Sequence, residues 1–247
     1  MPSSDNKSIM PKSRGAWGPW EALGVGLLAY VASLFFTIIV ALAYTLIVGR
    51  EVAQVEFSEN LGLNLGFMLV NSVGMLLVVA GFLAIKKSKF SELGIRAGKL
   101  KRYWTIPAGL IVYWGILIAS FTTLEAVFPA LDLNQNQDIV FKSADGTLEL
   151  LIAFVALVIV APISEELVYR GFVFRGLRNR FHPIWAALVS SILFGLVHGQ
   201  LNVFIDTFIL GMVLCWLFVK TKSIWPPIIL HAIKNGVAFY LLFFVGL

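Results

Sequence analysis

The stretch ALGVGLLAYVASLFFTIIVALAYTLIV, residues 22–48, runs for 27 residues without a charged side chain. About 20 apolar residues in a helix cross the hydrocarbon core of a bilayer, so this stretch alone is long enough to span a membrane. The rest of the chain has the same character, because 59% of its 247 residues are hydrophobic and only 13% are charged. A soluble domain of this size needs far more charge to cover its surface, which excludes that class of protein.

Six further apolar runs follow the first. They lie at residues 64–85, 104–124, 148–174, 184–201, 203–219 and 224–247. We therefore predict an all-α fold, a polytopic transmembrane helical bundle of about seven spans within a range of six to eight. The predicted organisation is a disordered cytoplasmic tail at 1–16, scaffold helices at 17–147, and helices at 148–247 of the same domain that carry the site.

The 19 Lys and Arg residues predict the orientation of the bundle. With the N-terminus in the cytoplasm, 16 of them fall on the cytoplasmic side, seven of these between residues 86 and 102. Cytoplasmic connections carry such an excess, so the N-terminus is predicted to be cytoplasmic. The net charge of +5 then reflects membrane orientation and gives no reason to expect a nucleic-acid partner. Cys215 is the single cysteine, which excludes an intramolecular disulfide and a cysteine-based metal site.

Ionisable residues are concentrated in the later spans, where each costs about 2.5–3.5 kcal/mol at mid-helix and so marks a candidate site. In the segment ISEELVYRG, residues 163–171, Glu166 and Arg170 are four residues apart and can pair on one helix face. Glu165 lies roughly 140° around the helix from Arg170 and is free to face a cavity. We expect Glu165 to be the reactive carboxylate. The alternative is that both carboxylates simply lie at the cytoplasmic interface beside nearby arginines.

Two further motifs carry polar residues on apolar helices. The segment FGLVH places Phe194 and His198 on one helix face, and the segment WPPIILHAIKN places His231 and Asn235 one turn apart. Taken singly, the histidine could be structural, and the His/Asn pair could serve only to hold two helices together.

Together, a carboxylate, two histidines and an amide supply the parts for the attack of water on a carbonyl. We predict that Glu165 takes the proton of the water with help from His198. His231 and Asn235 would then face the developing negative charge. Glu165, His198 and His231 also match the two-histidine, one-carboxylate set of catalytic zinc sites, so the sequence leaves open whether one divalent metal, zinc, is bound.

These motifs resemble those of the CPBP family, also called Abi, which unites type II CAAX prenyl endopeptidases with bacteriocin-immunity proteins. The family pattern of E-E-x-x-x-R, F-x-x-x-H and H-x-x-x-N/D is matched in order by residues 165–170, 194–198 and 231–235. The resemblance implies a protease that is either glutamate-dependent or a metalloprotease.

The resemblance also implies a role for each matched residue. The catalytic residues would be Glu165, His198, His231 and Asn235, and the supporting residues would be Glu166, Arg170 and Phe194. We therefore predict an intramembrane endopeptidase. Glu165 and His198 would act on the water, and His231 and Asn235 on the oxyanion.

The expected substrate and location follow from the same resemblance. Eukaryotic relatives act on prenylated proteins, whereas many prokaryotic relatives have no prenylated substrate. We expect a membrane-associated or lipid-anchored (CAAX-like) protein or peptide as the substrate, and membrane lipid as the surroundings. The compact chain is expected to be an integral protein of a prokaryotic plasma membrane, with its site open to the cytoplasm.

Two other functions fit the same residues. One is a non-catalytic bacteriocin-immunity protein or other partner that uses the cavity only to bind a membrane protein. The other is a proton- or cation-coupled transporter, for which Asp206 would be an additional residue. Asp206 is more simply expected to be an interfacial acid at the outer end of its span, and Lys234 to snorkel or to lie on another face.

Overall fold

The computed structural model describes residues 17–131, 133 and 146–245, so the predicted tail at 1–16 lies outside the described residues. Within this part the chain is all-helical and contains no strand, as predicted. The helices are α1 (Pro19–Val48), α2 (Arg50–Glu59), α3 (Leu61–Ile85), α4 (Thr105–Val127), α5 (Thr147–Phe154), α6 (Ala161–Glu166), α7 (Arg175–Arg178), α8 (Pro183–Leu196), α9 (Leu201–Thr221) and α10 (Trp225–Tyr240). Short 3-10 turns lie at Phe90–Leu93 and Leu100–Arg102, and π-helical turns at Val155–Val160, Leu167–Phe174 and Leu241–Val245.

Six helical segments of the described part are long and apolar enough to cross a membrane. They are Pro19–Val48, Leu61–Ile85, Thr105–Val127, Thr147–Arg178, Leu201–Thr221 and Trp225–Val245. The remaining predicted span, 184–201, is the shorter helix α8, whose 14 residues extend about 21 Å and do not match a hydrocarbon core of about 30 Å. It is shorter because the chain turns back before α9, where Gly199 has a φ of 75°.

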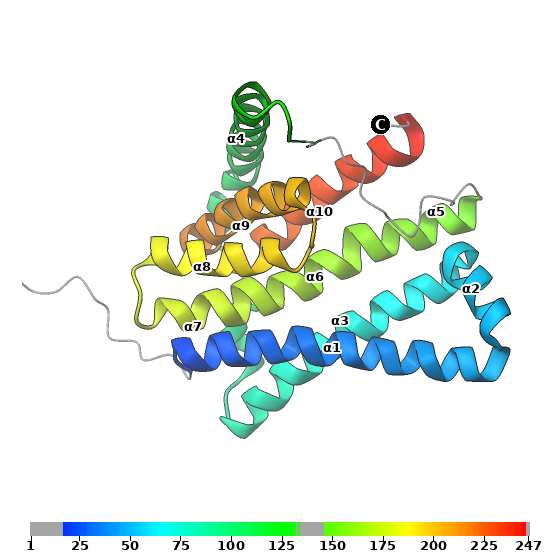
Figure 1. The fold of residues 1–247 in the computed structure, drawn as a ribbon. Helices are drawn as coiled ribbons and strands as arrows, with labels where there is room; N and C mark the ends of the chain where they lie inside the picture. The colour runs from blue at the N-terminus through cyan, green and yellow to red at the C-terminus, as the bar shows by residue number, and fades with distance from the viewer. Residues whose placement is uncertain (1–16, 132, 134–145, 246–247) are drawn as a thin grey trace, which may run out of the picture.

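The segment Thr147–Arg178 forms the centre of the bundle. It continues through α5, α6 and α7, joined by the π-helical turns, with α1 and α3 on one side and α8, α9 and α10 on the other (Figure 1). We call this segment the central helix. The helix α4 packs against α9 and α10.

The buried core lies where the central helix meets α1, α8 and α9. Phe172, Phe194 and Leu214 are fully buried there, and Cys215 beside them is a buried free thiol. At the start of α1, the Trp17 ring stacks on Phe172 and its Nε1 donates to the Phe172 carbonyl at 3.0 Å. These contacts fix the N-terminal part of the bundle against the helix that carries the glutamates.

The connection from α1 to α3 is more ordered than the sequence pattern indicates. Its polar residues form α2, and the hydroxyl of Tyr44 donates to Glu56 of that helix. Asn60 then caps α3, because its Oδ1 accepts from the Leu63 amide at 3.0 Å. The helix α2 therefore closes one end of the bundle, between α1 and α3.

Candidate active site

The central helix departs from α-helical geometry beside the two glutamates. In the π-helical turn Val155–Val160, the Ala161 amide donates to the Ala156 carbonyl, five residues back. The next carbonyl, that of Leu157, would receive the amide of residue 162, but proline has no N–H. The Nδ2 of Asn235 donates to this carbonyl instead, at 2.9 Å. A predicted site residue on α10 thus satisfies the backbone group that Pro162 leaves unpaired.

Glu166 and Arg170 form the predicted pair inside the protein. Arg170 Nη1 lies 2.7 Å from Glu166 Oε1, and both side chains are fully buried. The same carboxylate oxygen lies 3.0 Å from Nδ1 of His231, so Glu166 joins the central helix to α10. A carboxylate that accepts from a histidine Nδ1 fixes the orientation of its ring. The alternative that both glutamates lie at an interface beside arginines does not hold for Glu166.

Phe194 is the common support of the charged and imidazole groups. The Arg170 guanidinium lies 4.2 Å from the centroid of its ring, a cation–π contact. The rings of His198 and His231 stand edge-on to Phe194, with centroids at 5.1 and 5.8 Å. Gly211 of α9 leaves room for this arrangement, because a Cβ there would lie 3.1 Å from Arg170 Nη2.

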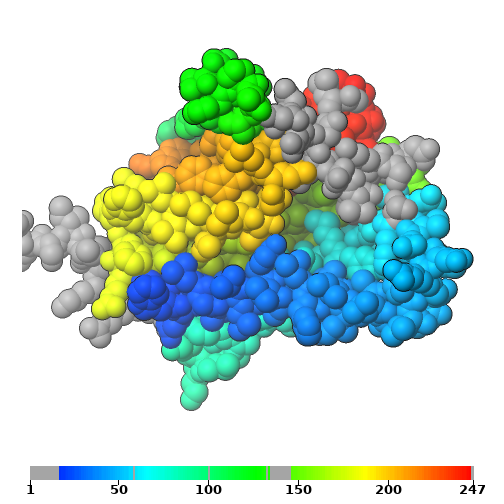
Figure 2. Space-filling model, viewed as in Figure 1, coloured from blue at the N-terminus to red at the C-terminus, as the bar shows by residue number. Residues whose placement is uncertain are grey.

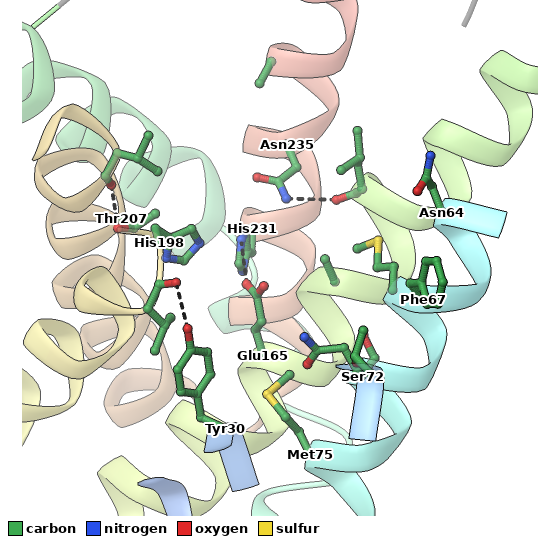
Figure 3. A pocket seen from close by; sticks show the side chains of 18 of the residues that line it. Tyr30, Asn64, Phe67, Ser72, Met75, Glu165, His198, Thr207, His231 and Asn235 are labelled. Carbon is green, nitrogen blue, oxygen red and sulfur yellow. Dashed lines mark hydrogen bonds and ion pairs between the residues drawn. The ribbon is translucent and has the colours of Figure 1, made fainter. Parts of the chain in front are cut away.

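Glu165 has a different environment from its neighbour. Its side chain is 22% exposed, and its Oε2 lies 3.7 Å from Nε2 of His231. That separation is too long for a direct hydrogen bond but leaves space for atoms of a water or a substrate beside both groups. Figure 3 shows the Glu165 carboxyl group pointing toward His231, with the His198 ring to the left of His231.

His198 lies just after α8, where the chain turns toward α9. Its Nδ1 is 2.8 Å from the Phe194 carbonyl, a group that can only accept, so Nδ1 carries a hydrogen. In the neutral ring Nε2 is therefore an acceptor. The hydroxyl of Tyr30 on α1 donates to the Val197 carbonyl at 3.4 Å, which ties this turn to α1 (Figure 3).

A cavity of about 710 Å³ brings the predicted catalytic residues together. Glu165, His198, His231 and Asn235 all line it, although they come from the central helix, the α8–α9 turn and α10. The supporting residues Glu166, Arg170 and Phe194 are fully buried and hold the lining residues from behind. All the residues that the motifs predicted therefore lie together. The predicted catalytic residues line the cavity, and the predicted supporting residues are buried behind them.

Two expectations for the cavity need correction. Asp206 and Lys234 do not lie apart at an interface and on another face, because Lys234 Nζ and Asp206 Oδ2 form an ion pair at 2.8 Å in the cavity lining. The Tyr113 hydroxyl on α4 donates to the other Asp206 oxygen. The reason is helix geometry: Lys234 follows His231 by three residues, and side chains three apart share a face.

The sequence motifs did not reveal the contribution of α1 and α3. Asn64, Asn71 and Ser72 on α3 and Tyr30 on α1 also line the cavity. The available signal was the spacing of Asn64 and Asn71, since seven residues make two helical turns and place two amides on one face of an apolar helix.

The three side chains of the zinc hypothesis do not form one compact set of metal ligands in the described structure. Among the residues that the structure describes, no three His, Cys, Asp or Glu side chains are grouped so that they could hold one metal ion. Glu165, His198 and His231 line one cavity without forming such a group.

Comparison with known proteins confirms the family resemblance of the C-terminal helices. Residues 147–237 match the family model described as type II CAAX prenyl endopeptidase Rce1-like. This range contains the central helix, α8, α9 and most of α10, and so every predicted catalytic residue. No solved structure matches the chain.

Relatives from three bacteria show similarity to this chain. The putative membrane peptidase YdiL of Bacillus subtilis is 36% identical over 77 residues, 31% of this chain and 32% of that protein. The membrane-embedded CAAX protease MroQ of Staphylococcus aureus is 33% identical over 84 residues, 32% of this chain and 34% of that protein. The UPF0177 protein YbdI of Lactococcus lactis is 27% identical over 165 residues, 65% of this chain and 87% of that protein. The matches to YdiL and MroQ therefore span about one third of those two relatives.

Proposed function

We propose that this protein is an intramembrane endopeptidase that uses Glu165 to activate water. The observation that carries the proposal is the contrast between two adjacent carboxylates. Glu166 is buried and held by Arg170 and His231, whereas Glu165 is partly exposed in the cavity and faces the other nitrogen of His231. The similarity to YdiL and MroQ, which are named a putative membrane peptidase and a membrane-embedded CAAX protease, supports a protease over the other predicted functions.

In the proposed reaction a water molecule lies between Glu165 and Nε2 of His198. Glu165 takes a proton from the water as the oxygen attacks the carbonyl carbon of the peptide bond. The same carboxyl group then gives the proton to the departing amide nitrogen, so that the products are an amine and a carboxylic acid chain end, which keeps the second proton of the water until it ionises. His198 orients the water, because its Nδ1 hydrogen is directed at the Phe194 carbonyl and its Nε2 is left to accept.

The oxyanion of the tetrahedral intermediate needs donors near the carbonyl oxygen. Asn235 gives one amide hydrogen to the Leu157 carbonyl, and its second amide hydrogen is available to the cavity. Because the Nδ1 hydrogen of His231 is directed at Glu166, His231 donates from Nε2 in its doubly protonated form.

The proposed substrate is a peptide in or at the membrane. Apolar side chains form much of the cavity lining, among them Ile38, Phe67, Met68 and Phe239. Such a lining suits an apolar peptide segment or a lipid-anchored chain of the CAAX-like kind. The proposed surroundings are a bacterial plasma membrane, in keeping with the bacterial relatives.

The test is cleavage by the purified protein in lipid nanodiscs, with membrane-inserted peptides and with prenylated and non-prenylated CAAX-like peptides. Glu165→Gln should lower the cleavage rate by about 100- to 10,000-fold, the usual contribution of a general base. Glu125→Gln, the same change at an exposed position of α4, is the matched control and should retain full activity. Full activity of Glu165→Gln would overturn the proposal.

Two additional measurements distinguish the glutamate-dependent protease from a metalloprotease and from a non-catalytic immunity protein. Cleavage that is unchanged by a chelator supports the glutamate-dependent mechanism, whereas loss of cleavage that zinc restores supports the metalloprotease. A non-catalytic immunity protein would show no cleavage, and its cellular protection would survive Glu165→Gln.

A further inference from the structure

The cavity lies mainly in the half of the bundle between Glu165 and α2. From Glu165 near the middle of the central helix, it extends toward α2, which contributes Phe57 to the lining. The lining residues of α1 include Thr37 and Ala41, in the half of that helix that leads into α2. On α3 they begin with Asn64, in its first turn after α2.

The opposite end of the bundle carries the basic connections. Seven Lys and Arg residues lie between α3 and α4 at residues 86–102, and two more lie at the end of α9, Lys220 in its last turn and Lys222 directly after it. Among the described residues, none that lines the cavity comes from these connections. At the α2 end the described connection has Arg50 as its single basic residue, together with three glutamates in α2. The excess of basic residues marks the end of the bundle opposite α2 as cytoplasmic.

The cavity is also open on the side of the bundle. Figure 2 shows the molecular surface hollowed between α1 and the α8–α9 pair, on the half of the molecule that α2 occupies. Because the spanning helices α1 and α9 run across this view, the hollow faces the position of the surrounding lipid. The Tyr30 hydrogen bond to Val197 joins α1 to the α8–α9 turn beside this opening.

We infer that the cavity opens to the non-cytoplasmic half of the membrane, and that a substrate chain reaches Glu165 from that side. This is opposite to the sequence-based expectation that the site opens to the cytoplasm. The substrate consequence rests on the proposed function: the peptide bond would belong to a membrane-inserted segment on the non-cytoplasmic side. A chain end anchored to the cytoplasmic surface would have to pass the basic end of the bundle, where no residue of the cavity lies.

The experiment measures which side of the membrane supplies water-soluble reagent to the cavity. Ala41→Cys on α1 and Met68→Cys on α3 place a thiol in the lining, outside the proposed catalytic residues. The side markers are two exposed positions, Glu51→Cys on α2 and Lys101→Cys in the basic connection. The probe is a small, membrane-impermeant methanethiosulfonate with a quaternary ammonium group, added to right-side-out and to inside-out vesicles. The native thiol, Cys215, is buried, so the unsubstituted chain is the blank, and Cys215→Ala replaces it if any label appears.

The expected result is that both cavity thiols and Glu51→Cys react in right-side-out vesicles, while Lys101→Cys reacts only in inside-out vesicles. Protection of the cavity thiols until the inner side is exposed would overturn the inference. Reaction of Lys101→Cys from the outer side would overturn it as well, because the orientation would be reversed. Labelling does not require turnover, so this result stands apart from the outcome of the cleavage test.

Discussion

Nδ1 of His231 lies 3.0 Å from Oε1 of Glu166, although the two residues are 65 positions apart in the chain. The same oxygen is 2.7 Å from Nη1 of Arg170, so one buried carboxylate serves both a cation and a histidine. Glu166 therefore links the motif on the central helix to the motif on α10. It fixes which nitrogen of His231 faces Glu165.

The first prediction separates the two adjacent glutamates by stability. Glu166→Gln leaves the Arg170 cation buried without its counter-charge, and breaking such a pair costs about 3–5 kcal/mol of the free energy of unfolding. Glu165→Gln removes a partly exposed carboxylate and should leave that free energy nearly unchanged. Denaturant unfolding of both variants in mixed micelles checks the difference. Equal stability of the two variants would contradict the assignment of Glu166 as the structural partner.

The second prediction concerns the Phe194 ring. Phe194→Leu removes the surface against which Arg170, His198 and His231 are packed, so the histidines lose their fixed position. The rate of the chemical step should fall on the order of 100-fold, the usual effect of small misplacements of catalytic groups, with little change in KM. The matched control is Phe82→Leu, which makes the same change where the ring contacts Phe172. A similar loss of kcat in both variants would indicate a general packing defect.

Local relationships in the site could be predicted from the sequence, whereas relationships between helices could not. The pair Glu166–Arg170 follows from the spacing of one turn within a single helix, and the separation of Glu165 from it follows from the same geometry. The contact of His231 with Glu166 depends on how far α10 slides and rotates against the central helix. Packing of the whole bundle sets these two quantities.

The same limit explains the errors. Asp206 and Lys234 are on different helices, and neither residue alone indicates the other as its partner. The length of α8 depends on the turn before α9, where a left-handed glycine ends an apolar run that continues in the sequence. By contrast, the fold class depended only on the summed length of apolar runs, which tertiary contacts do not change.

The third prediction concerns the Asp206–Lys234 ion pair. Asp206→Asn and Lys234→Met each leave a charge without its partner in an apolar bundle, so both should lower the free energy of unfolding. The double variant removes both charges and should be less destabilised than the sum of the two single variants. We expect a coupling energy between about 0.5 and 3 kcal/mol from the double-mutant cycle. Additive effects would mean that the ion pair does not hold α9 and α10 together.

The fourth prediction tests the two roles of Asn235. Asn235→Leu leaves the Leu157 carbonyl without its donor, which should cost on the order of 0.6 kcal/mol, the average for hydrogen bonds between membrane helices, and no more than about 1.7 kcal/mol. Pro162→Ala gives residue 162 an amide hydrogen of its own, which the π-helical turn directs toward that carbonyl. In the Pro162→Ala background, Asn235→Leu should therefore cost less stability than in the unmodified chain.

Activity in the same four proteins distinguishes a structural tie from a catalytic donor. If the second amide hydrogen of Asn235 stabilises the oxyanion, cleavage by Asn235→Leu stays low in both backgrounds, because Pro162→Ala restores only the backbone hydrogen bond. Removing one such donor lowers kcat by about 100- to 1000-fold in a well-studied case. Recovery of cleavage together with stability in the double variant would instead assign Asn235 to holding α10 against the central helix, and would leave His231 as the donor to the oxyanion.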